Sequence, residues 1–207
     1  MIALPFEHLN LRRNPFGEIS AEERTSLAMV DLEAAMTHLH SAFELRPPVV
    51  QLVGDKGYGK TTHLLAIAAR FPEAAYLYIP EGEFGKIPQL GEPLLVDEAQ
   101  RLTVWQRRKL FRSGRTLILG THRDFTGPLN RAGRSVLTLA ADRLTTPERV
   151  VEILNARVRA MRRHEGAIPV VTMSTVMGLL EVYGPDLRSI QHSLYEIFEQ
   201  LRSIQDV

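Results

Sequence analysis

The apolar positions of this chain follow two different periods along its length. The first two thirds contain five short apolar runs separated by polar or glycine-rich stretches, which is typical of strands buried on both faces of a parallel sheet. From Asp142 onward the apolar positions recur every three or four residues, as in amphipathic helices. The five runs are residues 49–53, 74–79, 94–98, 116–120 and 136–139. We therefore predict an α/β protein with a five-stranded parallel sheet and a small C-terminal lid of three helices.

The three C-terminal helices are predicted from their starts and their apolar stripes. Thr146-Pro147 offers an N-cap residue followed by a proline at the first helical position. Two more helices are expected at about residues 172–183 and 186–203, separated by Gly184-Pro185. The apolar stripes of the three helices are expected to form a core rather than grooves for a partner.

The N-terminal region is predicted to contain an arm and then a helix. Residues 1–19 lack a period, and we expect an extended, folded-back arm anchored by the apolar side chains of Phe6, Leu9, Leu11 and Phe16. Ser20 and Glu23 have the spacing of a capping box, and a helical stripe follows at Leu32, Met36, Leu39 and Phe43. We divide the chain into an arm (residues 1–19), a core (20–141) and a helical lid (142–207).

The connections between the predicted strands differ in kind. Residues 62–70 follow the first strand with helix-forming side chains. Residues 81–93 contain three glycines and two prolines, so we expect a loop between the second and third strands. Residues 99–112 are predicted to form one helix, and a short helix is expected to carry residues 130–134.

Residues 54–61 (GDKGYGKT) match the phosphate-loop pattern G-x-x-x-x-G-K-[ST] without a substitution. An apolar run precedes them and a helical stretch follows, which is the context that the pattern requires. Glycines let backbone N–H groups turn toward a phosphate, and the helix N-terminus favours an anion. We expect a nucleoside triphosphate to bind here, with Lys60 near the β- and γ-phosphates and the Thr61 hydroxyl on Mg²⁺. The nucleotide-binding residues are expected to be Gly54, Asp55, Lys56, Gly57, Tyr58, Gly59, Lys60, Thr61 and Thr62.

Two adjacent carboxylates end the third apolar run. Ligands of open α/β sheets bind at the carboxyl ends of the strands, where Asp97 and Glu98 are expected to lie. We expect Asp97 to hold Mg²⁺ through water and Glu98 to activate the attacking water. His122, at the tip of the fourth strand, is expected to help hold that water, and the alternative is a plain surface histidine.

The amino-acid composition excludes some classes of protein but does not indicate a function. The formal net charge is +1, so no global charge argument for nucleic acid or membrane binding applies. The chain has no cysteine, and no apolar run approaches the roughly 18 residues of a membrane span. We expect a soluble, cytoplasmic protein without a secretory signal. A basic cluster within residues 101–115 is compatible with a phosphate backbone and equally with a solvated surface.

Taken together, these motifs resemble those of the AAA+ ATPases over nearly the whole chain. Residues 11–16 (LRRNPF) look like the L-R-x-N-P-F arm that opens many of the ATPases of transposition and type II secretion, and residues 96–100 (VDEAQ) resemble their D-E-A-Q motif. Replication initiators and helicase loaders belong to the same branch. The resemblance implies that His122 is the first sensor, that Arg131 is an arginine finger acting on a neighbouring subunit, and that Arg188 is the second sensor. Arg134 is the substitute finger.

The resemblance implies an ATP-binding and ATP-hydrolysing switch that forms homo-oligomers with ATP, as a ring or a filament. We expect it to act on DNA or to recruit a DNA-acting partner, as transposition regulators and helicase loaders do. The alternative is an ATPase of a secretion or remodelling system that acts on a protein partner without binding DNA. A phosphate-loop kinase of small molecules is a third reading.

Overall fold

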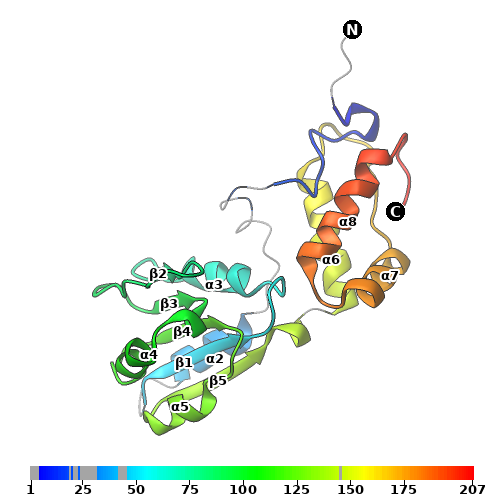
Figure 1. Ribbon diagram of the computed structural model, residues 1–207. Coiled ribbons are helices and arrows are strands. Elements are labelled where there is room, and N and C mark those ends of the chain that lie inside the picture. Colours follow the sequence, from blue (N-terminus) through cyan, green and yellow to red (C-terminus); the bar gives the residue numbers. More distant parts are fainter. Residues whose placement is uncertain (1–4, 19, 21–22, 24–31, 42–45, 145) are drawn as a thin grey trace. The chain divides into compact units, whose positions relative to one another are not determined.

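The computed structural model describes residues 5–18, 20, 23, 32–41, 46–144 and 146–207 (Figure 1). The chain divides into two compact units, one formed by residues 30–144 and the other by residues 1–29 together with 145–207. The N-terminal arm and the C-terminal helices thus belong to the same unit, which the three-part division predicted from the sequence did not anticipate.

The first unit contains a five-stranded sheet in the order β2-β3-β4-β1-β5, and all four strand pairs are parallel. This confirms the predicted α/β class and the five parallel strands. Each strand end lies within one residue of its predicted position. The strands are β1 Pro48–Val53, β2 Ala75–Tyr78, β3 Leu94–Asp97, β4 Leu117–Thr121 and β5 Ser135–Ala140.

Helices pack on both faces of this sheet. Helices α2 (Glu33–Ser41) and α3 (Lys60–Ala68) share one apolar core with alternate strand residues such as Leu95. Helices α4 (Val104–Phe111) and α5 (Thr126–Arg131) share the other core with the intervening residues such as Leu94. Successive side chains of a strand point to opposite faces, so a continuous apolar run is what a sheet covered on both sides needs.

Two predicted helices in this unit have different bounds. The single helix predicted over residues 99–112 is wrong, because a 3₁₀ turn, η3 (Ala99–Arg101), is separated from α4. Thr103 caps α4 in a capping box with Gln106, which starts a new helix there. Helix α5 ends at Arg131, so Arg134 lies in the connection to β5. Residues 81–93 form no helix or strand, as predicted.

The second unit contains α6 (Pro147–Ala160), α7 (Met173–Tyr183) and α8 (Leu187–Gln200), and α8 ends three residues before its predicted end. The 3₁₀ turn η1 (Glu7–Leu9) opens the arm, and η4 (Ala141–Leu144) ends the first unit. Leu9, Leu11 and Phe16 of the arm are buried in one core with the three helices. Asn14 is buried as well, and its amide donates to Tyr195 O and to Glu199 Oε1, both at 3.0 Å. The arm is therefore an integral part of this unit.

The predicted helix after Ser20 is described only in part. The Ser20 hydroxyl accepts from Glu23 N at 3.1 Å, and Ser20 N donates to the Glu23 carboxylate at 2.9 Å, as in the predicted capping box. Residues 24–31, and Phe43 of the predicted stripe, lie outside the described residues.

Candidate functional site

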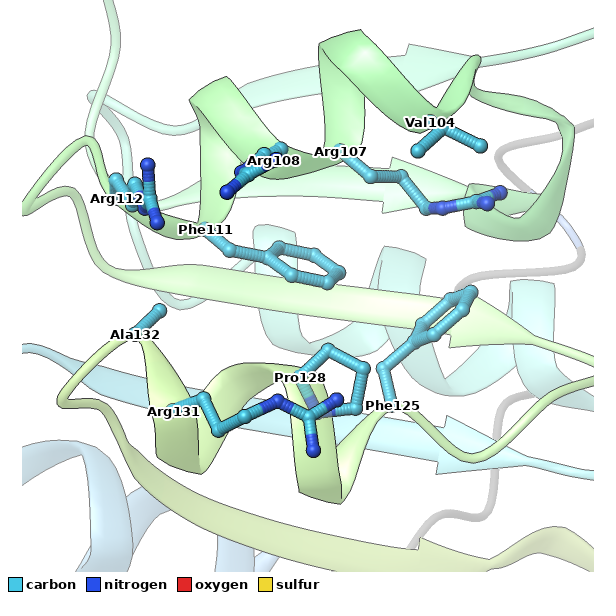
Figure 2. Close-up of a pocket in the computed structure, with 9 residues that line it drawn as sticks. All are labelled: Val104, Arg107, Arg108, Phe111, Arg112, Phe125, Pro128, Arg131 and Ala132. Carbon is cyan, nitrogen blue, oxygen red and sulfur yellow. The ribbon is translucent and has the colours of Figure 1, made fainter.

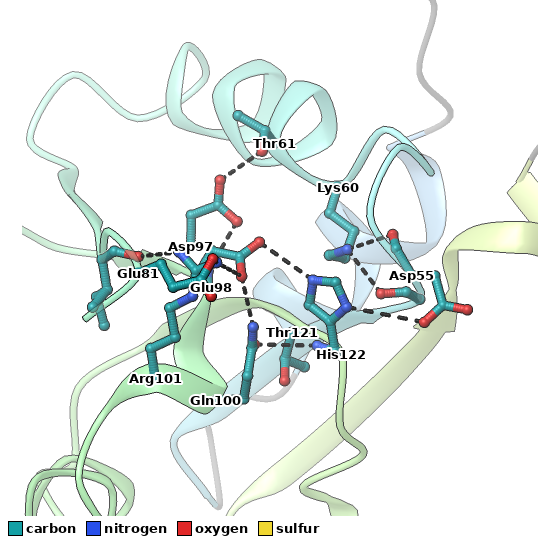
Figure 3. Close-up of polar contacts among 12 residues, drawn as sticks. Asp55, Lys60, Thr61, Glu81, Asp97, Glu98, Gln100, Arg101, Thr121 and His122 are labelled. Carbon is teal, nitrogen blue, oxygen red and sulfur yellow. Dashed lines mark hydrogen bonds and ion pairs between the residues drawn. The ribbon is translucent and has the colours of Figure 1, made fainter. Parts of the chain in front are cut away.

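Three polar segments meet at the carboxyl edge of the sheet (Figure 3). Because β4 lies between β1 and β3, its tip at Thr121 and His122 lies between residues 54–61 and the Asp97-Glu98 pair. Gly54 N donates to Thr121 O at 3.2 Å, which continues the pairing of β1 with β4 into the loop. The sheet order thus brings together residues that are far apart in the sequence.

Residues 54–61 connect β1 directly to α3. Gly57 and Gly59 have φ values of 95° and 75°, a backbone region that residues with a Cβ rarely adopt. Gly59 is the N-cap of α3 and supplies no side-chain cap, and the first turn of α3 contains no acidic residue. Uncapped N–H groups at a helix N-terminus are suited to bind an anion. The loop therefore has the backbone that phosphate binding requires.

Lys60, the first residue of α3, is buried with 5% of its surface exposed. Its Nζ donates to Gly54 O at 2.8 Å and to Asp55 O at 2.7 Å, so the ammonium lies within the loop (Figure 3). Burial lowers the pKa of Lys60, and the nearby carboxylates, Glu98 first, oppose that shift. A buried cation whose hydrogen bonds go to carbonyl oxygens is well placed to neutralise an incoming anionic group.

Asp97 lies at the end of β3 with 1% of its surface exposed. The Thr61 hydroxyl donates to Asp97 Oδ2 at 2.6 Å, Tyr76 Oη donates to the same oxygen at 3.1 Å, and Glu98 N donates to Oδ1 at 3.0 Å. A hydroxyl and a carboxylate in contact supply the two protein oxygens that Mg²⁺ commonly takes beside phosphate and water. Among the described residues, no group of three or more His, Asp or Glu side chains is arranged as a metal cage. The donor set therefore fits a cation shared with a ligand.

Gly120 of β4 makes room for that carboxylate. A Cβ at this position would lie 2.7 Å from Asp97 Oδ1 and 2.8 Å from Leu64 Cδ1. Both distances are far below van der Waals contact, so a larger residue would displace Asp97 or α3. A glycine inside a strand often marks such a close approach.

Glu98 follows β3 with a φ of 61°, the left-handed region that is uncommon for a residue with a side chain. Its carboxylate accepts from Gln100 Nε2 at 2.6 Å and lies 3.3 Å from Arg101 Nη2. The other oxygen lies 3.4 Å from His122 Nε2. Unusual backbone conformations concentrate at functional sites, where neighbouring contacts hold them.

His122 connects the two sides of the site. Its Nε2 contacts Glu98, its Nδ1 lies 4.0 Å from Asp55 Oδ1, and its backbone N donates to Gln100 Oε1 at 3.2 Å. The imidazole is therefore a member of this polar cluster rather than an isolated surface histidine. Gln100 also belongs to the cluster, because its side-chain amide contacts both the Glu98 carboxylate and the backbone N of His122.

The structure does not join all the predicted residues. Arg131 is exposed at the end of α5 and makes no hydrogen bond or ion pair with the polar cluster that the described residues form. Arg134 has 2% of its surface exposed, and its guanidinium donates to the backbone oxygens of Pro47, Pro48, Phe111 and Arg115. An arginine with these bonds cannot reach another subunit, so the role of substitute finger is not supported. Arg188 is exposed at the start of α8 in the other unit, and its predicted role stays a prediction.

The basic cluster of residues 101–115 contains two groups, the arginines that bond to backbone oxygens and the basic residues that are exposed. Arg101 bonds to Ile79 O, Arg107 to Gln100 O and Leu102 O, and Arg115 to Pro88 O and to Gly91 O. These three side chains hold loops of their own chain. Arg108, Lys109 and Arg112 are the exposed members of the cluster.

Tyr76, Gln100 and Gly120 were not predicted as site residues from the sequence. Gly120 carried a usable signal, because a glycine within an apolar run suggests a close approach. Gln100 stands two residues after Glu98 in the motif already considered. Tyr76 gave no signal, because an aromatic residue in a strand is ordinarily part of a packed surface.

Comparison with known proteins leaves the family open. No protein-family model matches this chain, and no curated protein matches it significantly. Within the described part of the chain, none of the helices has the length and apolar character to cross a membrane.

Proposed function

We propose that this chain is an ATP-binding and ATP-hydrolysing switch of the AAA+ type, with the three C-terminal helices as its lid, that self-associates and acts on DNA or recruits a DNA-acting partner. The observation that carries the proposal is the 2.6 Å hydrogen bond from Thr61 to Asp97. It joins the end of the phosphate-loop pattern to the first of the two adjacent carboxylates. Lys60 and Glu98 lie beside that bond, within one polar cluster at the carboxyl edge of the sheet.

In the proposed reaction, water attacks the γ-phosphorus of ATP and the bond to the β-phosphate oxygen breaks, which releases ADP and phosphate. Glu98 accepts a proton from the water, and His122 and Gln100 orient the Glu98 carboxylate. Lys60 and the N-terminal N–H groups of α3 stabilise the negative charge on the phosphates. Thr61 and Asp97 would hold Mg²⁺, which neutralises charge on the β- and γ-oxygens when bound.

Lys60→Ala tests the binding step. We expect loss of detectable ATP binding, measured by titration with a fluorescent ATP analogue, because the remaining N–H groups do not supply a full positive charge. Lys109→Ala is the matched control, since Lys109 is an exposed lysine of α4, outside the loop, and the variant should bind ATP nearly normally. Normal binding by Lys60→Ala would contradict the proposed site.

Glu98→Gln tests the hydrolysis step. The amide keeps the shape of the side chain but accepts a proton poorly, so we expect phosphate release to fall by about 10²-fold or more. ATP binding should be retained, and the ATP-bound assembly should accumulate. If Glu98→Gln releases phosphate at the rate of the parent chain, Glu98 is not the base.

The alternative is a protein-partner ATPase of a secretion or remodelling system, without direct DNA binding. It is favoured by the contacts of Arg101, Arg107 and Arg115, which engage their own chain and leave fewer cations for a phosphate backbone. Binding to duplex DNA with a non-hydrolysable ATP analogue separates the two readings. Affinity that falls steeply with salt supports the DNA reading. No binding, or affinity that ignores salt, favours the protein partner.

A further inference from the structure

A pocket of about 390 Å³ lies between α4 and α5, away from the polar cluster (Figure 2). Its apolar lining includes the rings of Phe111 and Phe125 and the side chain of Pro128. Arginines from both helices surround this lining, as Figure 2 shows. They are Arg107, Arg108, Arg112 and Arg131.

The described residues place no carboxylate in an ion pair with the arginines around the pocket. Arg108, Arg112 and Arg131 are exposed and make no ion pair with any carboxylate of the described residues. Arg107 lies over the Phe125 ring at 5.3 Å and donates to backbone oxygens only. The pocket is therefore suited to a ligand that combines carboxylates with a large apolar side chain.

The same unit displays such a segment. Residues 81–84 (EGEF) lie in the loop between β2 and β3, and the Phe84 side chain is 84% exposed. The Glu81 carboxylate is 92% exposed and has only a 3.7 Å contact with Arg101, and Glu83 is exposed too. Exposure of a whole phenylalanine ring costs free energy in water, so an exposed phenylalanine between acidic residues is a candidate contact.

The loop is held so that its tip stays outward. Arg101 Nη1 donates to Ile79 O at 2.8 Å before the tip, and Gln106 Nε2 donates to Gly85 O at 2.8 Å after it. These bonds fix both ends of residues 81–84 to side chains from η3 and α4. Holding both ends restricts the segment, which lowers the entropy lost when it binds.

We propose that residues 81–84 of one copy of this chain bind the α4–α5 pocket of a second copy. Phe84 enters the apolar pocket, and Glu81 and Glu83 pair with arginines of its rim. Both partners of the contact lie in residues 30–144, so every copy carries one of each. The inference deepens the proposed function, on which it rests for self-association.

The contact would also connect the α4–α5 pocket of one copy with the candidate nucleotide site of the other. Arg101 lies within 3.7 Å of Glu81 and 3.3 Å of Glu98, so the loop borders the candidate nucleotide site. Arg131 lines the pocket. A copy that binds the loop therefore contacts its neighbour beside the candidate nucleotide site.

The test measures the mass of the full-length chain in solution, with and without a non-hydrolysable ATP analogue. We expect the parent chain to assemble, and Phe84→Ala to weaken assembly by about 30-fold, the usual effect of removing a buried aromatic anchor. Leu90→Ala is the matched control, because Leu90 is 85% exposed in the same loop and should assemble normally. A parent chain that stays monomeric in both conditions, or Phe84→Ala that assembles normally, overturns the proposal.

A charge exchange tests the polar part of the contact. Arg108→Glu and Glu83→Arg should each assemble poorly alone, whereas the chain with both changes should regain assembly. Both positions are exposed, so both single variants are expected to fold. Failure of the double variant to assemble better than the single variants would contradict the pairing of these two side chains.

Trp105 gives a second readout, since it is the chain's single tryptophan, is 77% exposed and lies beside the pocket residue Val104. A peptide of residues 79–86 should shift its fluorescence in the parent chain and not in Arg108→Glu. If a single-stranded DNA oligonucleotide gives that shift and the peptide does not, the occupant is nucleic acid and the proposal is wrong.

The outcomes also separate this inference from the proposed function. Hydrolysis by a parent chain whose assembly ignores Phe84 would leave the function standing and remove the contact. Assembly through Phe84 in a chain that binds no ATP would leave the contact standing and remove the proposed function.

Discussion

The two edges of the sheet use polar side chains in opposite ways. At the carboxyl edge, Thr61 donates to Asp97 and His122 contacts Glu98, and these carboxylates oppose the lowering of the Lys60 pKa by burial. At the amino edge, Arg134 bonds to backbone oxygens at the starts of strands and connections, and its guanidinium is almost completely buried. The first edge gathers acidic and basic side chains beside the loop of residues 54–61, and the second uses a single buried charge to close the fold.

This difference shows why two arginines three residues apart have separate roles. Arg131 is exposed on the rim of the pocket, whereas burial lowers the pKa of Arg134 to about 10. That value still leaves the Arg134 guanidinium charged at neutral pH, so its charge is compensated by the surrounding carbonyl dipoles. Changes at the amino edge should therefore affect stability, and changes at the carboxyl edge should affect ligand binding.

Arg134→Ala is expected to give the largest effect on stability. It removes the hydrogen bonds of the guanidinium to four backbone oxygens and also removes a packed side chain, which should lower the free energy of unfolding by about 3 kcal/mol or more. Denaturant titration measures this change. Arg131→Ala is the control, and an exposed substitution should change the free energy by less than about 0.5 kcal/mol. Equal losses in the two variants would remove the contrast between the edges.

Gly120→Ala is expected to have the next largest effect, and it tests the carboxyl edge. The added Cβ must displace Asp97 or Leu64, which should cost about 1–3 kcal/mol and weaken Mg²⁺-dependent ATP binding. Gly178→Ala, in α7, makes the same chemical change where a Cβ meets nothing within 4 Å. That control should gain stability, because alanine favours a helix over glycine. Unchanged ATP binding in Gly120→Ala would show that Asp97 need not be held in place.

The smallest expected effect separates function from stability at Glu98. Its φ of 61° suits glycine, so Glu98→Gly should be more stable than Glu98→Ala by about 1 kcal/mol. Both variants lose the same carboxylate contacts, so the difference isolates the backbone. Thermal unfolding compares them, and both should lose hydrolysis. Glu98→Ala as stable as Glu98→Gly would mean that the left-handed backbone carries no strain.

Much of the carboxyl edge was predictable from the sequence. A complete phosphate-loop pattern and a carboxylate pair each follow an apolar run, and the rules for parallel sheets place both at one edge. The amino edge was not predictable, because an arginine in a loop usually remains solvated and nothing local distinguishes Arg134 from Arg131. The break between η3 and α4 was also missed, since it depends on the capping role of Thr103. The role of Arg188 stays a prediction for another reason, because it depends on the placement of one unit against the other.

Gln51, buried in β1, should slow the opening of the backbone around Phe125. Its Nε2 lies 2.8 Å from Asp124 Oδ1 and 2.7 Å from Thr138 Oγ1, and its Oε1 accepts from Phe125 N at 3.0 Å. The backbone amide of a loop residue ordinarily exchanges its hydrogen with solvent quickly. The Phe125 amide is bonded to a side chain in the middle of the sheet, so it should exchange as slowly as the amides of the strands. Residues 124–126 are thereby tied to the sheet, and we expect them to open together with its strands.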